Sequence, residues 1–163
     1  MPDISTEVAI ATQTLSSAAS TITFSSIPST YTDLRLVFTG VSASGNSIYL
    51  RLNGDTGSNY SFTELYGTGG SAFSSRSSNT IVIGFGSTGF TTTPQLLTAD
   101  IFSYAGSTNK TVLTTAAQDN NGSGGVSANV GLWRNTAAIT SVSILQIVGN
   151  IAASSTATLY GIL

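Results

Sequence analysis

The chain has 163 residues, and only 7% of them are charged: five Lys or Arg and seven Asp or Glu. A soluble domain usually carries about 25% charged residues. The chain contains no Cys and no His, which excludes disulfides, Cys/His zinc sites, thiolate nucleophiles and imidazole bases. Five dispersed cations make no basic stripe, so we expect neither nucleic acid nor an anionic membrane as a partner.

The N-terminal segment is the first element of the chain. Residues 1–7 carry two acids and no cation, which predicts that no secretory signal peptide is present. No apolar run reaches the ~20 residues that a membrane-spanning helix needs. We expect residues 1–18 to form an arm or a first strand that contacts a neighbouring subunit. Residues 19–163 are expected to form one domain.

Apolar residues alternate with polar ones at a period of two along most of the chain, which is typical of half-buried strands. Thr, Val, Ile, Tyr and Phe are plentiful, charged helix formers are scarce, and no window shows a helical stripe. We therefore predict an all-β fold of about ten short strands with little or no helix. An antiparallel β-sandwich of the jelly-roll type is the expected architecture. The predicted strands are residues 8–10, 22–24, 34–38, 48–52, 81–85, 97–104, 112–116, 126–132, 142–148 and 156–162.

The alternation in the predicted strand at residues 126–132 predicts the orientation of Trp133, the single Trp of the chain. Val126, Ala128, Val130 and Leu132 are expected to face the core, so Trp133 is expected to point away from it. An outward Trp is covered by a loop of its own chain, buried in a subunit contact, or used as a platform for a sugar. Residues 54–78 and 119–125 are predicted to be long loops, and the first contains several aromatic residues.

Two short motifs match enzyme signatures, and the surrounding sequence argues against both. Residues 84–89 fit the dinucleotide pattern G-x-G-x-x-G, but a β-branched run ending in Pro94 follows where a helix would have to begin. Residues 107–110 fit S-x-x-K, but they lie between two predicted strands and the companion motifs are missing. We predict that both are turns or strand ends.

The seven carboxylates make two further kinds of site possible, a catalytic pair of acids or a calcium-binding loop. No spacing among the seven acids selects the two carboxylates that a glycosidase needs, so we expect no enzymatic activity. Residues 53–55 and 119–121 offer oxygen ligands, but neither follows the calcium-loop spacing. We expect no cofactor and no dedicated metal site. The seven acids are Asp3, Glu7, Asp33, Asp55, Glu64, Asp100 and Asp119.

Four motifs, in this order, give the chain a resemblance to a known group of proteins. They are TITFSSIP at residues 21–28 with YTDL at 31–34, RLNGD at 51–55 with NYS at 59–61, WRNTAAIT at 133–140, and SSTATLYGI at 154–162. From about residue 19 to the C-terminus, the chain resembles small virion structural proteins of tailed bacteriophages, including those of cyanophages and marine phages. The resemblance implies a β-sandwich or jelly-roll module, often trimeric, on the capsid or in the tail. It carries over no catalytic residue.

We therefore expect a structural protein of a phage particle, located in the virion and assembled in the host cytoplasm. The first hypothesis is a capsid cement or decoration protein that forms a homotrimer and binds the major capsid protein or another virion protein. Its expected contact residues are apolar side chains displayed away from the core, chiefly Trp133, Tyr49 and Val37. The alternative is a tail-fibre or spike module that recognises a host surface glycan through Tyr60, Tyr66 and Trp133.

Overall fold

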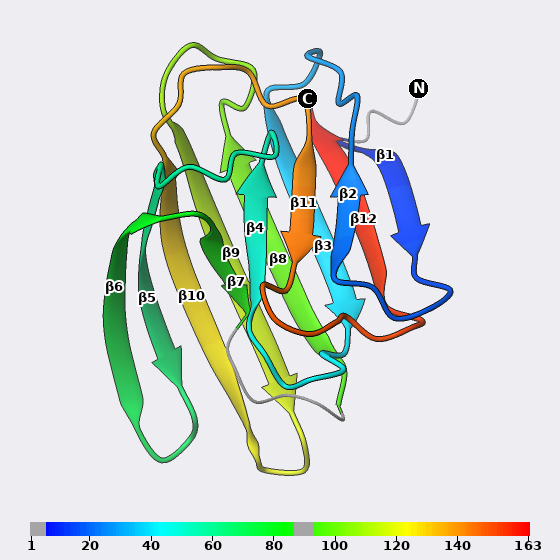
Figure 1. Cartoon of the computed structure of the whole chain (residues 1–163), viewed down its shortest axis with the longest axis vertical. Helices are drawn as coiled ribbons and strands as arrows, with labels where there is room; N and C mark the ends of the chain where they lie inside the picture. The colour runs from blue at the N-terminus through cyan, green and yellow to red at the C-terminus, as the bar shows by residue number, and fades with distance from the viewer. Residues whose placement is uncertain (1–5, 87–92) are drawn as a thin grey trace.

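The computed structural model describes residues 6–86 and 93–163, and in this part of the chain every regular element is a strand. The prediction of an all-β fold is confirmed. Figure 1 shows the strands stacked in two layers. The strands are β1 (Glu7–Thr14), β2 (Thr21–Phe24), β3 (Asp33–Gly40), β4 (Ile48–Leu52), β5 (Tyr60–Gly67), β6 (Ala72–Thr80), β7 (Ile83–Gly86), β8 (Gln95–Phe102), β9 (Lys110–Asp119), β10 (Gly124–Trp133), β11 (Val142–Leu145) and β12 (Thr156–Ile162).

The strands form two antiparallel sheets of unequal width. The large sheet has the order β1-β12-β3-β8-β9-β10-β5-β6, and the small sheet has the order β2-β11-β4-β7. The two sheets make a β-sandwich, as the sequence predicts. A jelly roll has eight strands in two sheets, whereas the described residues form twelve strands, and the jelly-roll topology stays a prediction.

The core lies between the sheets and is built from alternate residues of facing strands. Along β3, Leu34, Leu36 and Phe38 are fully buried, and Ile48 and Leu50 of β4 are buried opposite them. Each such side chain contributes about 1.5–3 kcal/mol through its removal from water. The same alternation sends the intervening residues of the large sheet to its outer face.

Ten of the strands coincide with predicted ones, and the β5–β6 hairpin is the exception. The sequence predicts a loop over residues 54–78, whereas the strands Tyr60–Gly67 and Ala72–Thr80 pair along their whole length. The loop prediction is therefore wrong from residue 60 onward. β6 is an edge strand that is mostly exposed on both faces, so its Ser-rich sequence carries no period-two signal.

The predicted phase of β10 is also wrong. Ser127, Asn129, Gly131 and Trp133 face the core, whereas Val126, Ala128 and Val130 are exposed. The gap between the sheets is narrow here, because a Cβ on Gly131 would lie only 2.5 Å from Ile83 Cγ2. Small inward residues fit this gap, and the aliphatic set is left on the outer face.

The N-terminal segment is part of the chain's own sheet. β1 pairs with β12 over its length, with a β-bulge between Ala9 and Ala11. Residues 1–5 of the expected arm lie outside the described residues, as do residues 87–89 of the G-x-G-x-x-G match. A domain boundary at residue 18 and a contact with a neighbouring subunit stay predictions.

Candidate functional site

The outer face of the large sheet carries half of the exposed large hydrophobic side chains among the described residues. Val130 of β10 lies opposite Leu113 of β9, and Val126 lies opposite Ala117, whose other neighbour is Leu96 of β8. These cross-strand pairs make the apolar side chains contiguous. We call them the apolar patch: Leu65, Leu96, Phe102, Leu113, Val126 and Val130, which are between 41% and 63% exposed.

Two ion pairs that share one Arg lie beside the patch on this face. Arg35 of β3 forms ion pairs with Asp100 of β8 and Glu7 of β1. The hydrogen bond to Asp100 is the main reason that the pKa of Arg35 is raised, and Glu7 adds to it against the opposing effect of burial. The outward positions of β9 and β10 carry Thr, Leu, Ala and Val, except for Asp119 and Gly124 at the ends that the β9–β10 turn joins. A partner that covers the positions away from this turn therefore desolvates no charge on these two strands.

Trp133 lies inside the chain, which corrects the predicted outward orientation. Its side chain is 1% exposed and stacks on Tyr60, with ring centroids 6.2 Å apart. Tyr60 is fully buried as well, and its hydroxyl donates a hydrogen bond to the carbonyl of Leu52 at 3.0 Å. Burial raises the pKa of Tyr60 to about 12. Neither side chain is displayed to a subunit or to a glycan, so both are wrong as surface candidates.

Asp55, in the loop between β4 and β5, fixes the position of Trp133 through a hydrogen bond. Asp55 Oδ2 accepts hydrogen bonds from Trp133 Nε1 at 2.7 Å and from Asn59 Nδ2 at 2.9 Å, and its Oδ1 accepts one from the backbone of Gly57. Burial tends to raise the pKa of Asp55, but the three hydrogen bonds outweigh burial and hold the pKa below its ordinary value. The carboxylate oxygens are thus engaged by N–H groups of the protein.

Asn53, whose side-chain oxygen is the other candidate metal ligand in this loop, also makes hydrogen bonds within the protein. Its Oδ1 accepts from the backbone N–H groups of Thr140 and Ser141, and its Nδ2 donates to the carbonyl of Ala138. The two loops are held together by these bonds. Within residues 6–86 and 93–163, no group of three or more acidic side chains is arranged to hold a metal ion.

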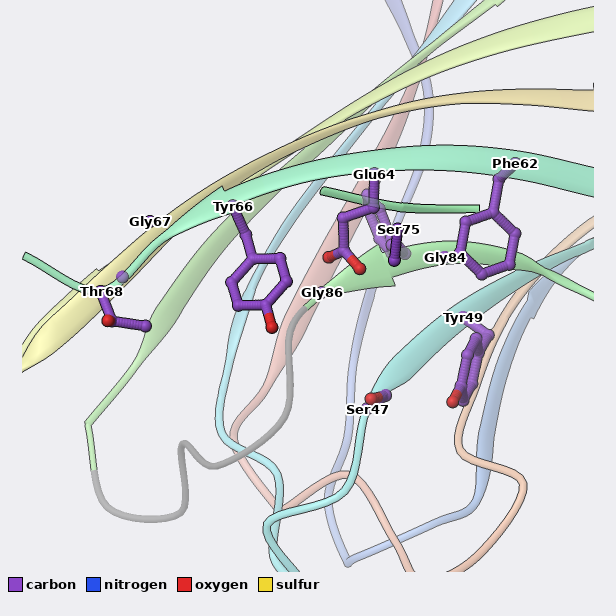
Figure 2. A pocket seen from close by; sticks show the side chains of 12 residues that line it. Ser47, Tyr49, Phe62, Glu64, Tyr66, Gly67, Thr68, Ser75, Gly84 and Gly86 are labelled. Carbon is purple, nitrogen blue, oxygen red and sulfur yellow. The ribbon is translucent and has the colours of Figure 1, made fainter. Parts of the chain in front are cut away.

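The other three candidate residues keep some exposure. Val37 of β3 is half-buried on the outer face, where Thr158 and Thr98 are its cross-strand neighbours. Tyr49 of β4 and Tyr66 of β5 come from different sheets and line one pocket of about 320 Å³ (Figure 2). The structure therefore brings Tyr49 and Tyr66 together and places Val37 elsewhere.

The pocket exists because the large sheet is wider than the small one. β5 and β6 extend beyond β7, the edge strand of the small sheet, and their inward side chains project over that edge. Phe62, Glu64 and Tyr66 point into the space from β5, and Tyr49 approaches from the other side, as Figure 2 shows. Sequence reasoning missed Phe62 and Glu64 as a pair with Tyr66, because residues 60–67 were predicted to be a loop.

Glu64 is the one carboxylate among the residues that line this pocket. Burial raises its pKa, and a hydrogen bond with Ser75 opposes the increase. A glycosidase would need a second carboxylate across the cleft. Glu7 and Asp100, which both bond to Arg35, lie on the outer face of the large sheet and not in this pocket.

Lys110 of the S-x-x-K match holds its own loop together. Its side chain is fully buried, and Nζ donates to the carbonyls of Gly106, Thr108 and Thr136. Burial lowers the pKa of Lys110. Lys110 begins a strand rather than a helical turn, so the arrangement differs from the one that the penicillin-recognising motif requires.

No family model matches the chain, and the curated proteins include no sequence that is significantly similar to it. No helix in the described part of the chain is long and apolar enough to cross a membrane. The structural features available to assign a function are therefore the apolar patch and the pocket.

Proposed function

We propose that this protein is a non-enzymatic structural component of a tailed-phage virion, and that it acts as a capsid cement or decoration protein. In this role it buries the outer face of its large sheet against neighbouring protein and so reinforces the shell. The proposal joins the sequence resemblance to the surface chemistry of the fold. The apolar patch is the observation that carries it.

The patch has the properties of a surface that is covered in an assembly. Six large apolar side chains are contiguous on four neighbouring strands, whereas exposed hydrophobic residues on a monomer are usually scattered singly. Asp119, at the turn end of β9, is the one outward charge on the patch strands β9 and β10, so burial of the rest of these two strands costs no charge desolvation. The partner that we propose is a second copy of this chain, in a homotrimer that then contacts the major capsid protein.

Assembly through a sheet face is better supported than assembly through strand addition. The edge strand β1 is interrupted by a β-bulge, and the edge strand β6 carries Arg76 among its Ser residues. Bulges and charges at edges are the devices that prevent strands of other chains from pairing. The broad face of the sheet is therefore the surface left for a neighbour.

The copy number in purified particles tests the function. Quantitative mass spectrometry of phage particles whose genome encodes this chain is expected to find hundreds of copies per particle. A count of a few tens or fewer would favour the alternative, a tail-fibre or spike module that binds host glycan. Absence of the protein from purified particles would contradict both positions on the virion.

A further inference from the structure

The pocket between the β5–β6 hairpin and the edge of the small sheet is a site that the assembly proposal does not use. It opens on the inner side of the large sheet, whereas the apolar patch lies on the outer side. Its volume of about 320 Å³ is within the range of small-molecule sites, about 300–1,000 Å³. It is large enough for a single sugar-sized ring.

The walls of the pocket are aromatic on two sides. Tyr66 and Phe62 project from β5, and Tyr49 of β4 lines the opposite side (Figure 2). The ring of Tyr66 stacks on Phe73 of β6, with centroids 4.9 Å apart, so its orientation is supported by the neighbouring strand. A preorganised aromatic face suits the C–H face of a pyranose ring, and the phenol hydroxyl serves the polar rim of the sugar.

The polar groups of the pocket are acceptors and hydroxyls. Glu64 supplies a carboxylate, Ser47, Thr68 and Ser75 supply hydroxyl groups, and the lining contains no Lys or Arg. A phosphate, sulfate or carboxylate ligand would meet a negative charge with no cation to balance it. A ligand that donates hydroxyl hydrogens would instead satisfy a half-buried carboxylate through charge-assisted hydrogen bonds.

Two buried oxygens behind the pocket have no partner among the described residues. Ser127 and Asn129 are each only 2% exposed. Ser127 Oγ and Asn129 Oδ1 make no hydrogen bond, although Asn129 Nδ2 donates one to Thr114. Asn129 lies opposite Glu64 in the register, and Ser127 lies opposite Tyr66. A side chain at Gly84, which lines the pocket, would come within 3.5 Å of Asn129 Oδ1. Both oxygens lie behind the lining rather than in it, so they are buried polar atoms without a partner next to the site.

We propose that this pocket binds a neutral saccharide, with a pyranose ring packed against Tyr66 and its hydroxyls bonded to Glu64. Tyr49 and Phe62 close the sides of the site. The wide large sheet creates the pocket, the aromatic residues select a ring with an apolar face, and the lone carboxylate selects an uncharged polyol. The site is independent of where the protein sits in a particle.

Titration of the whole protein with a panel of sugars tests this proposal. The probes are D-glucose, D-galactose, D-mannose and N-acetyl-D-glucosamine, with N-acetylneuraminic acid as the charged comparison, measured by saturation-transfer NMR and calorimetry. At least one neutral sugar is expected to bind saturably, and N-acetylneuraminic acid is expected to bind more weakly. Absence of saturable binding by every neutral sugar, or preferential binding of N-acetylneuraminic acid, would overturn the proposal.

Three variants locate the site. Glu64→Gln is nearly isosteric and is expected to weaken binding about tenfold or more, because it removes a charge-assisted hydrogen bond. Tyr66→Ala is expected to weaken it at least as much. Tyr160→Ala is the matched control, since Tyr160 is a half-buried aromatic on the outer face of β12 and is expected to leave binding unchanged. Circular dichroism confirms that each variant is folded, and unaltered binding in folded Glu64→Gln and Tyr66→Ala would contradict the assignment.

Discussion

The hydrogen bond between Trp133 and Asp55 gives a quantitative test of the reversed phase of β10. The bond joins Trp133 Nε1 to Asp55 Oδ2 at 2.7 Å, and Trp133 is almost completely buried. A hydrogen bond to a charged group contributes about 1.5–3 kcal/mol, and a buried donor left unpaired costs about 1–3 kcal/mol. Asp55→Ala also removes the acceptor of Asn59 and Gly57, so we expect a total loss of about 2–4 kcal/mol.

A double-mutant cycle isolates this bond from the other effects of each substitution. Trp133→Phe removes the N–H donor and leaves a small cavity beside Tyr60, with an expected loss of about 1–3 kcal/mol. The free energies of unfolding are measured for the wild type, both single variants and the double variant by urea denaturation, followed by circular dichroism because Trp133 is the only Trp. We expect a coupling free energy of about 1.5–3 kcal/mol.

The pH dependence of the cycle follows from the lowered pKa of Asp55. A carboxylate with a lowered pKa in the folded state stabilises the protein above its unfolded pKa of about 3.9, and the contribution is lost as the pH falls through the folded pKa. The destabilisation by Asp55→Ala should therefore be largest near neutral pH and should shrink in acid. A coupling below about 0.5 kcal/mol at neutral pH would refute the inward position of Trp133.

Three further substitutions test other parts of the structure. Gly131→Ala should destabilise the protein by about 1–3 kcal/mol in urea denaturation, because the added Cβ would lie 2.5 Å from Ile83 Cγ2. Ile83→Ala should reduce this loss, and additive losses in the double variant would contradict the packing. Glu64→Gln should raise the Tm at neutral pH and leave it nearly unchanged below about pH 4.3, because the raised pKa of Glu64 makes its ionised form destabilising as the pH rises through the folded pKa. A lower Tm at neutral pH would contradict this reasoning. Asn53→Ala should lower the free energy of unfolding by about 2–4 kcal/mol, because it leaves two backbone N–H groups without their acceptor and places Ala at a φ of 50°. A loss below about 0.5 kcal/mol would show that other contacts hold the loops of Asn53 and Thr140 together.

The sequence was sufficient to predict the fold class because the period-two pattern is clear in several strands and no segment shows a helical one. It failed at β6, where an exposed Ser-rich edge strand has no apolar face to reveal it. It also failed at β10, because the pattern alone favours the aliphatic residues as the buried set. The close approach of Ile83 to Gly131 and the hydrogen bond from Trp133 to Asp55 reverse that preference. Both are contacts between segments distant in the sequence.

The candidate residues lie in different parts of the structure, and their sequence spacing did not indicate which of them come together. Tyr49 and Tyr66 line one pocket, but nothing in their spacing along the chain indicates that they meet. Their proximity depends on β5 lying beyond the edge of the small sheet, which follows from the pairing order of the strands. The aliphatic residues of β10 were predicted for the core and instead make up part of the apolar patch, which is why the sequence could not indicate that surface.

The central claim is that the outer face of the large sheet is covered by a neighbouring copy of the chain. Sedimentation equilibrium of the wild type and of Val130→Lys tests it most directly, because Val130 is 49% exposed at the centre of the patch and a Lys there should leave the fold intact. Thr21→Lys is the matched control, at an exposed position of β2 in the small sheet. We predict a trimer for the wild type and for Thr21→Lys, and a monomer for Val130→Lys. A monomeric wild type, or an assembly that Val130→Lys leaves unchanged, would contradict the claim.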